Sequence, residues 1–348
     1  MDNNKRRYQN ILRKMNLQEE DVINEAMKKK GLYTSSEIYP LSSLHFELTS
    51  KCNALCKHCY NNSGKYNAED RMNLKRWIDF ANYIVSRGGV FECLISGGEP
   101  LLFRDGLFEI MDVLHDDGTI FLIMTNGFLL NEEYIKRFKK YQYHWFQISI
   151  DGFNAEYHDK FRQLPGSWEK AVSGAKGIVN AGIPLKIAHC VTPYNIDGID
   201  AMCSLAAQIG ASSIMIGGIS LSGRTGTNLD LLLSDSDKKI MKNKIEENRI
   251  RYKGRMKVKS ANSVRSGLIN HAKHPRSGAV IRPNGDIRID GMAPFVAGNI
   301  LDNDFTDIWS RKLEKCWDDI RVNEFIEDFN KNDYNTKYIN YCDGEIYL

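Results

Sequence analysis

The chain has 348 residues, of which 42% are hydrophobic and 26% are charged, and its formal net charge is +3. These values are typical of a globular protein large enough to bury a substantial core. The basic residues form no long stripe and no run of about 18 apolar residues occurs, so we expect neither a nucleic-acid partner nor a membrane span.

Residues 1–43 are predicted to form a helical lead-in, because Ile11, Leu12 and Met15 begin a partial apolar stripe. From residue 44 onward, short apolar segments alternate with segments of helical periodicity. The predicted strands are 44–49, 91–96, 120–125, 144–151, 184–192 and 212–217, and the predicted helices are 73–87, 106–115, 131–140, 168–181 and 197–209. Alternation of this kind predicts a parallel sheet with right-handed crossovers.

The predicted strands have one apolar and one polar face. In the fourth strand, Phe146 and Ile148 alternate with Gln147, Ser149 and Asp151, and the first and fifth strands alternate in the same way. Successive side chains point to opposite faces of a strand. We therefore expect the apolar set to pack on the helices and the polar set to line an interior that opens near the strand C-termini.

After about residue 228 the pattern changes. A charged helix is predicted from Ser234 to Tyr252, with Ser234 as its N-cap. Residues 279–282 and 287–289 are predicted to form a β-hairpin around an Asn-Gly turn. A final helix near 305–320 and a polar tail follow.

The most distinctive feature is a Cys-x3-Cys-x2-Cys run formed by Cys52, Cys56 and Cys59. The three thiols are too close in sequence to cross-link a fold, but they supply three soft ligands on one loop, which suits an iron–sulfur cluster. A cubane cluster has four irons, so three cysteines leave one iron open to a substrate or cofactor. The alternative interpretation is a zinc site with His58 as the fourth ligand.

Together with the tetrapeptide Gly97-Gly98-Glu99-Pro100, this motif resembles the signature of radical S-adenosylmethionine (SAM) enzymes. The resemblance implies a partial (β/α)6 barrel, one 4Fe–4S cluster with an open iron, and SAM bound at that iron. It also implies reductive cleavage of SAM to a 5′-deoxyadenosyl radical, with a flavodoxin- or ferredoxin-type protein as the electron donor. Because an exposed cluster iron is easily oxidised and the N-terminus has no apolar secretory core, we expect a cytoplasmic location.

The same resemblance assigns cofactor contacts to individual residues. It places the methionine amine of SAM at Gly97–Pro100 and its adenine near His58. Ser149 and Asp151 are expected to contact the ribose. Arg162 is expected to pair with the SAM carboxylate, with a surface ion pair as the alternative.

Two further segments are expected to lie close to the bound molecules. Thr125 and Asn126 close the third strand and are expected at the cofactor mouth, unless they form only a turn. The segment Gly218-x4-Gly223-Arg224-Thr225 imitates a phosphate-binding loop, but it lacks the required lysine. We expect it to line the substrate instead.

The C-terminal hairpin resembles the SPASM/twitch extension of peptide-modifying radical SAM enzymes. This implies three parts: the lead-in at 1–43, the barrel at 44–227 and the extension at 228–348. The cysteines that hold auxiliary clusters in that extension are missing, and Asp290 stands where one of them is expected. Without an auxiliary cluster as acceptor, a substrate radical would more readily receive a hydrogen atom, rearrange, or return its electron to the SAM cluster. Cys190, facing the interior, and Cys342, in the tail, are the candidate hydrogen donors.

These features predict an enzyme that modifies a ribosomally made peptide, with epimerisation as the preferred reaction. One alternative is radical dehydrogenation or rearrangement of a small metabolite, such as a sugar or a tetrapyrrole precursor. Another is a non-catalytic iron–sulfur or zinc protein that binds a peptide.

Overall fold

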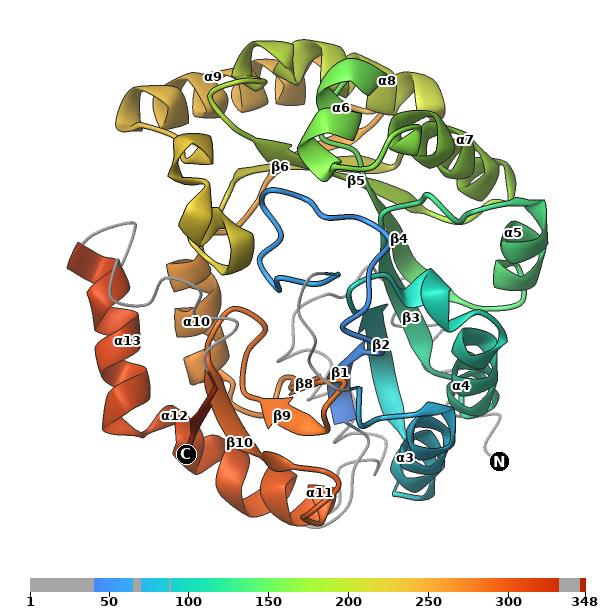
Figure 1. Cartoon of the computed structure of the whole chain (residues 1–348), viewed down its shortest axis with the longest axis vertical. Helices are drawn as coiled ribbons and strands as arrows, with labels where there is room; N and C mark the ends of the chain where they lie inside the picture. The colour runs from blue at the N-terminus through green and yellow to red at the C-terminus, as the bar shows by residue number, and fades with distance from the viewer. Residues whose placement is uncertain (1–40, 65–69, 88, 332–344) are drawn as a thin grey trace.

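The computed structural model describes residues 41–64, 70–87, 89–331 and 345–348. Its eleven strands form one sheet in the order β11-β10-β9-β8-β1-β2-β3-β4-β5-β6-β7. Strands β1 to β6 run parallel in chain order, and the sheet is not closed, because it ends at β7 on one side and at β11 on the other. Figure 1 shows the sheet as an open arc with helices along its outer side.

The barrel part contains six strands and the helices that connect them. The strands are β1 (Leu41–Glu47), β2 (Val90–Ser96), β3 (Ile120–Thr125), β4 (Tyr143–Ser149), β5 (Leu185–Val191) and β6 (Ser213–Gly218). The helices are α3 (Leu74–Ser86), α4 (Asp105–Asp116), α5 (Glu132–Phe138), α6 (Ala155–Arg162), α7 (Ser167–Asn180) and α8 (Ile199–Ile209), with short 3₁₀ turns at Pro100–Phe103 and Ile196–Gly198. The predicted alternation of strands and helices is confirmed, and α6 was not predicted.

The two faces of the strands divide as predicted. Leu44, Phe46 and Leu48 are fully buried in the core beneath the helices. Gln147 and Ser149 of β4 line a cavity on the inner face. The expected polar interior is therefore confirmed, and it lies where the parallel strands end.

The remaining elements extend the same sheet at both edges. After 3₁₀ turns at Gly223–Thr227 and Leu229–Leu231 come α9 (Asp235–Arg251), β7 (Lys257–Ser260), α10 (Val264–Lys273), β8 (Val280–Ile281), β9 (Asp286–Arg288) and β10 (Phe295–Asn299). The last elements are α11 (Phe305–Asp307), one turn of π-helix (Ile308–Lys312), α12 (Leu313–Trp317), α13 (Ile320–Lys331) and β11 (Ile346–Tyr347). β7 lies beside β6, whereas β8 lies beside β1. The sheet thus runs without a break into the segment after residue 228.

Local chemistry explains which predictions in this part hold. Ser234 caps α9 in a reciprocal capping box with Asp237, as predicted. The hairpin of β8 and β9 is also confirmed, with Gly285 at a φ of +95° in its turn. The predicted helix near 305–320 is present as a continuous helical run from Phe305 to Trp317, but it is not the final one. The Asp319 carboxylate accepts the Arg321 N–H at 2.9 Å and caps a further helix, α13.

Candidate functional site

A cavity of about 260 Å³ opens on the inner face of the sheet, at the C-terminal ends of the strands. The loop after β1, residues 48–64, carries the three cysteines across this inner face (Figure 1). Cys52, Cys56 and Cys59 all line the cavity, and all three thiols are free. The three predicted metal ligands therefore come together on one wall.

The two glycines after β2 bring the Gly-Gly-Glu-Pro segment against this cysteine loop. A Cβ atom added at Gly98 would lie 2.2 Å from the Lys51 carbonyl oxygen, and one added at Gly97 would lie 2.7 Å from that of Thr49. The Gly98 N–H donates to Thr49 O at 2.6 Å, and the Glu99 N–H donates to Lys51 O at 2.9 Å. Glycine is required at both positions because the Cβ of any other residue would overlap these carbonyl oxygens.

Glu99 has a different position from the one expected of a direct SAM contact. Its side chain is fully buried, and within the Gly97–Pro100 segment only the two glycines line the cavity. Its carboxylate accepts the Thr125 hydroxyl at 2.6 Å, the Asn126 N–H at 2.8 Å and the Leu101 N–H at 3.1 Å. Burial raises the pKa of Glu99, although these hydrogen bonds act in the opposite direction. In this geometry Glu99 fixes the loops that form the cavity wall.

The residues at the C-terminal end of β3 lie at the cavity, where the cofactor mouth is expected. Thr125 and Asn126 both line the cavity. The Asn126 side-chain amide lies 3.9 Å from the Cys52 sulfur and donates to Asn53 Oδ1 at 2.8 Å. The Ala54 N–H approaches the same sulfur at 3.4 Å. Donors of this kind around a thiolate are typical of iron–sulfur ligation.

Arg224 lines the cavity and donates hydrogen bonds to the cysteine loop. The sequence does not reveal this role. Its guanidinium donates to Cys56 O at 2.7 Å and to Ser63 O at 2.8 Å, and its backbone N–H donates to Cys59 O at 3.0 Å. Gly223, at a φ of +54°, lets the turn approach, because a Cβ there would lie 2.2 Å from Cys59 O. Arg224 thus lines the cavity and also holds the ligand loop in place.

Asp151 and Arg162 form a buried ion pair at the floor of the cavity. Arg162 is 6% exposed, and its Nη2 and Nε lie 2.7 Å and 2.9 Å from Asp151 Oδ2. The alternative of a surface ion pair for Arg162 is therefore wrong. Burial is the largest single effect and raises the pKa of Asp151. The charge of Arg162, the two nearby histidines and the Cys190 N–H together outweigh it and hold this pKa well below its ordinary value. Asp151 Oδ1 also accepts the Cys190 N–H at 2.9 Å, so both carboxylate oxygens are already engaged.

His58 projects into the same cavity. Its ring stacks on Phe161 with centroids 4.2 Å apart and an interplanar angle of 2°. Burial is the largest of the effects that lower its pKa to about 4, so the ring is neutral at pH 7. A neutral imidazole stacked on a phenyl ring is a flat surface that suits a heteroaromatic base.

Of the two candidate hydrogen donors, the structure describes one. Cys190 lies on β5 and lines the cavity, beside Asp151 and His58. Burial is the largest cause that raises its pKa, so the group remains a thiol rather than a thiolate. Cys342 lies outside the described residues. Cys93 and Cys203 are fully buried in the core.

The arrangement fits a multi-iron cluster better than a single zinc ion. Ligand atoms of one zinc ion lie 2.0–2.3 Å from the metal and therefore within roughly 4 Å of one another. Among the described residues, the group whose ligand atoms lie within 4.8 Å is His58, Asp151 and Cys190, not the three loop cysteines. That group is unsuited to a cation, because Arg162 already neutralises Asp151.

Two nitrogen atoms on the cavity wall are buried without a partner, His58 Nδ1 and Arg224 Nη2. Buried polar groups normally have hydrogen-bond partners, and a bound polar cofactor would supply them. The residues of this cavity therefore fit an iron–sulfur cluster with a polar cofactor beside it.

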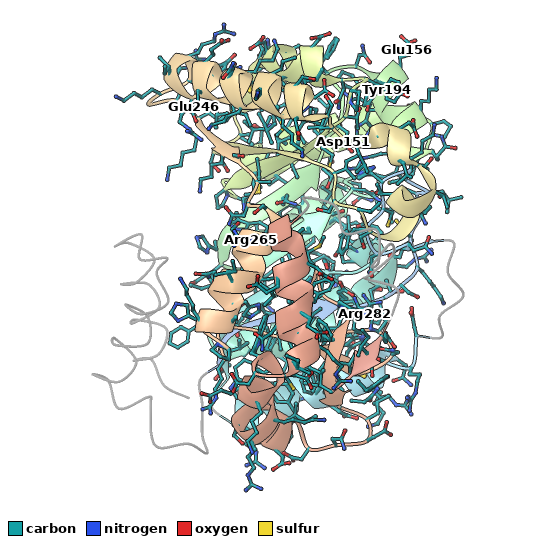
Figure 2. The ribbon with its side chains drawn as sticks, turned by 90° about the vertical axis from the view of Figure 1, so that its left-hand side faces the viewer. Asp151, Glu156, Tyr194, Glu246, Arg265 and Arg282 are labelled. Carbon is teal, nitrogen blue, oxygen red and sulfur yellow. The ribbon has the colours of Figure 1, made fainter. Side chains whose placement is uncertain are left out.

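The C-terminal hairpin reaches the ligand loop through Arg282. Its guanidinium donates to Glu47 Oε2 at 2.9 Å and to Asn61 Oδ1 at 2.6 Å. Burial is the largest single effect and raises the pKa of Glu47. The charge of Arg282, together with His45, Arg288 and the Asn61 hydrogen bond, outweighs it, so this pKa lies below its ordinary value. Figure 2 shows Arg282 in the lower half of the molecule and Asp151 in the upper half. The sequence carries no signal for this contact between Glu47 and Arg282.

Asp290 occupies a position where the SPASM resemblance leads us to expect a cysteine. Its Oδ2 lies 2.9 Å from His271 Nδ1, and His271 Nε2 lies 3.2 Å from Gly278 O. The imidazole therefore spans the two sides of the hairpin. Within the described part of the segment after residue 228, the single cysteine is Cys316, which is buried on α12.

Comparison with known proteins gives the same result for the barrel. Residues 46–206 match the radical SAM superfamily. The AdoMet-dependent heme synthase of Methanosarcina barkeri is 33% identical over 166 residues, which are 48% of this chain and 47% of that protein. AlbA of Bacillus subtilis, a biosynthesis protein for the antilisterial bacteriocin subtilosin, is 27% identical over 311 residues, 86% of this chain and 68% of AlbA.

Solved structures share the fold at low identity. The structure of Streptococcus suis SuiB bound to the precursor peptide SuiA superposes with a TM-score of 0.63 at 15% identity, over 83% of this chain and 68% of SuiB. The chain spans about half the length of the first curated relatives it matches. No helix among the described residues has the length and apolar content to cross a bilayer.

The superfamily match, the three thiols on one cavity wall and the glycine segment hydrogen-bonded to their loop lead to one conclusion. Residues 46–206 of this chain are a radical SAM domain, which binds one 4Fe–4S cluster and SAM.

Proposed function

We propose that the chain modifies a ribosomally made peptide by radical chemistry. The observation that carries this proposal is the length of the similarity to AlbA, a protein of bacteriocin biosynthesis. It covers 86% of this chain and therefore includes residues outside the radical SAM domain at 46–206. The alignment with AlbA therefore also includes the hairpin region after residue 228, which contacts the ligand loop through Arg282.

Within this proposal each cavity residue has one task. The thiolates of Cys52, Cys56 and Cys59 hold the cluster, and backbone groups of Gly97 and Gly98 face the methionine end of SAM. His58 packs on the adenine. When bound, the cluster and SAM supply a 5′-deoxyadenosyl radical that removes a hydrogen atom from a substrate carbon.

Ser149 and Asp151 are proposed on the ribose side of the cavity. Because both oxygens of Asp151 already accept hydrogen bonds, the ribose contact falls mainly to Ser149, which lines the cavity. Arg162 is proposed to reach the SAM carboxylate while it remains paired with Asp151. A guanidinium has five N–H donors, and two of them are used by Asp151.

We propose epimerisation as the specific reaction. The Cys190 S–H bond breaks, its hydrogen atom forms a new C–H bond at the substrate carbon radical, and a thiyl radical remains on Cys190. One electron from a flavodoxin- or ferredoxin-type protein and one proton from solvent restore the thiol. The raised pKa of Cys190 supports this role, because a thiol can give a hydrogen atom and a thiolate cannot.

The test is turnover of the peptide encoded beside the gene, under anaerobic conditions in D2O. Epimerisation predicts one backbone deuterium per modified residue with no loss of hydrogen. Cys190→Ala should abolish deuterium incorporation but not the formation of 5′-deoxyadenosine. Cys203→Ala, which removes a buried thiol outside the cavity, should incorporate deuterium normally. A product two hydrogens lighter and free of deuterium would exclude the reaction.

A second candidate is oxidation of a tetrapyrrole precursor, supported by the 33% identity to the heme synthase of M. barkeri. That similarity covers 48% of this chain, compared with 86% for AlbA. Incubation with iron–coproporphyrin in place of the peptide separates the two candidates, because a heme-forming enzyme would convert it with formation of 5′-deoxyadenosine.

A further inference from the structure

The segment 248–285 has a charge unlike that of the rest of the chain. It contains ten lysine and arginine residues and no aspartate or glutamate, in a protein whose net charge is +3. The ten are Arg249, Arg251, Lys253, Arg255, Lys257, Lys259, Arg265, Lys273, Arg276 and Arg282. This segment contains β7 and α10, and Figure 2 views the molecule from this side, with Arg265 labelled.

Six of these side chains are exposed and form no ion pair with a described residue: Lys253, Arg255, Lys257, Lys259, Arg265 and Lys273. The others have acidic partners, such as Glu246 for Arg249 and Asp200 for Arg251. A surface with so many unpaired charges of one sign attracts a partner of the opposite sign.

The strand at the centre of this surface also has a free edge. In the described sheet β7 has β6 on one side and no strand on the other. The N–H groups of Lys257 and Ala261 donate to Ser212 O and Ile216 O on the β6 side. Backbone groups alternate along a strand, so the N–H of Val258 and both backbone groups of Ser260 point away from β6. They can form the ladder of an added strand.

A further lysine, Lys186, lies on the inner side of this edge, close enough for the charge of Lys259 to act on it. Lys186 on β5 is 8% exposed, and its Nζ lies 3.4 Å from the centre of the Trp145 ring. Burial, and after it the charge of Lys259, lower the pKa of Lys186 to about 8. A carboxylate placed beside Lys259 would reduce this repulsion between the two lysines.

The edge is also aligned with the cavity. β7 runs parallel to β6, and its end at Ala261 packs against Gly217, where an added Cβ would lie 2.5 Å from the Ala261 Cβ. The loop after β6 carries Arg224 to the cavity wall. A peptide paired with β7 would therefore have one end near the cavity mouth.

We propose that the free edge of β7 binds an acidic, extended segment of the substrate peptide by strand addition. This inference rests on the proposed function, since it assumes a peptide substrate. A nucleic acid would also be attracted by the charge, but bases bind by stacking on exposed rings. The exposed aromatic side chains of the described chain, Phe153, Tyr194 and Tyr347, all lie outside residues 248–285.

The experiment measures binding and not turnover, so it is independent of the reaction. The full-length, cluster-loaded protein without SAM is titrated into a fluorescein-labelled peptide of about six Glu-Thr repeats. A peptide with the same number of Glu-Pro repeats has the same charge, but it lacks half of the N–H groups and should bind at least about tenfold more weakly.

Lys257→Glu with Lys259→Glu should weaken binding of the Glu-Thr peptide about tenfold. Lys239→Glu with Lys242→Glu, the same charge change on exposed positions of α9, should leave it unchanged. Ser260→Pro should weaken binding without loss of a bond to β6, because that N–H points outward. Circular dichroism shows whether each variant is folded, and the lysine variants test the proposal even if Ser260→Pro does not fold.

Three results would overturn the proposal. Equal affinity for the Glu-Thr and Glu-Pro peptides would exclude strand addition. An equal loss in the α9 variant would exclude a local site. Tighter binding of a single-stranded oligonucleotide, weakened by the β7 variant, would identify a nucleic-acid surface instead. Absence of peptide turnover would refute the proposed function but would leave these binding results unaffected.

Discussion

Replacing Asp151 by Asn tests whether the buried ion pair fixes the cavity floor. The substitution keeps the side-chain shape and an acceptor for the Cys190 N–H, but it leaves the charge of Arg162 without a partner at 6% exposure. Two unit charges about 4 Å apart interact by about 4 kcal/mol at an effective dielectric constant of about 20. Breaking a buried pair by removing one partner costs about 3–5 kcal/mol. We expect a loss of about 3 kcal/mol in the free energy of unfolding.

Chemical unfolding of the cluster-loaded protein, followed by circular dichroism, measures this loss. The matched control is Asp79→Asn, which breaks an ion pair with Lys75 whose side chains are 58% and 82% exposed. It should cost less than about 0.5 kcal/mol. The double variant Asp151→Asn with Arg162→Gln should lose at least about 1 kcal/mol less unfolding free energy than the two single variants lose in sum. A loss below about 1 kcal/mol for Asp151→Asn alone would refute the reasoning.

The pH dependence follows from the depressed pKa of Asp151. A carboxyl whose folded-state pKa is lowered stabilises the protein fully above its unfolded pKa of about 3.9, and this contribution is lost as pH falls through the folded-state pKa. The difference between wild type and Asp151→Asn should therefore stay constant from about pH 8 to about pH 5. A difference that changes with pH within that range would show that Asp151 titrates between about pH 5 and about pH 8, so that its pKa is raised and not depressed.

Three further predictions concern the loops around the cavity. Gly98→Ala should abolish cluster binding, measured as iron content, because its Cβ would overlap a carbonyl oxygen of the cysteine loop. The control is Gly267→Ala, where an added Cβ has no atom within 4 Å. This variant should retain iron and stabilise α10 by about 0.5–1 kcal/mol. Arg224→Ala should speed iron loss to a chelator severalfold because the loop carbonyls lose their donor, while the exposed Arg311→Ala should not. Glu99→Gln should cost about 1–3 kcal/mol in unfolding free energy, because an amide nitrogen would face a backbone donor; a cost near zero would show that Glu99 is not fixed in this way.

Much of the barrel could be predicted because its signals are local. The apolar period-two pattern of β1 and β4 and the capping residues of α9 depend on near neighbours in sequence. The elements that were missed lack such signals. β7 has charged residues at two of its four positions, so its sequence does not show the apolar run of a buried strand.

The sequence by itself determined the chemistry of this protein: three cysteines on one loop specify the cluster, and two glycines specify a backbone that approaches them closely. Only the tertiary structure decided which distant groups support that loop. Arg224 and Arg282 donate to atoms of the loop from positions more than 160 residues away. Because spacing cannot report such long-range hydrogen bonds and charges, the role of Glu99 and the partner of Arg162 became visible only in the folded chain.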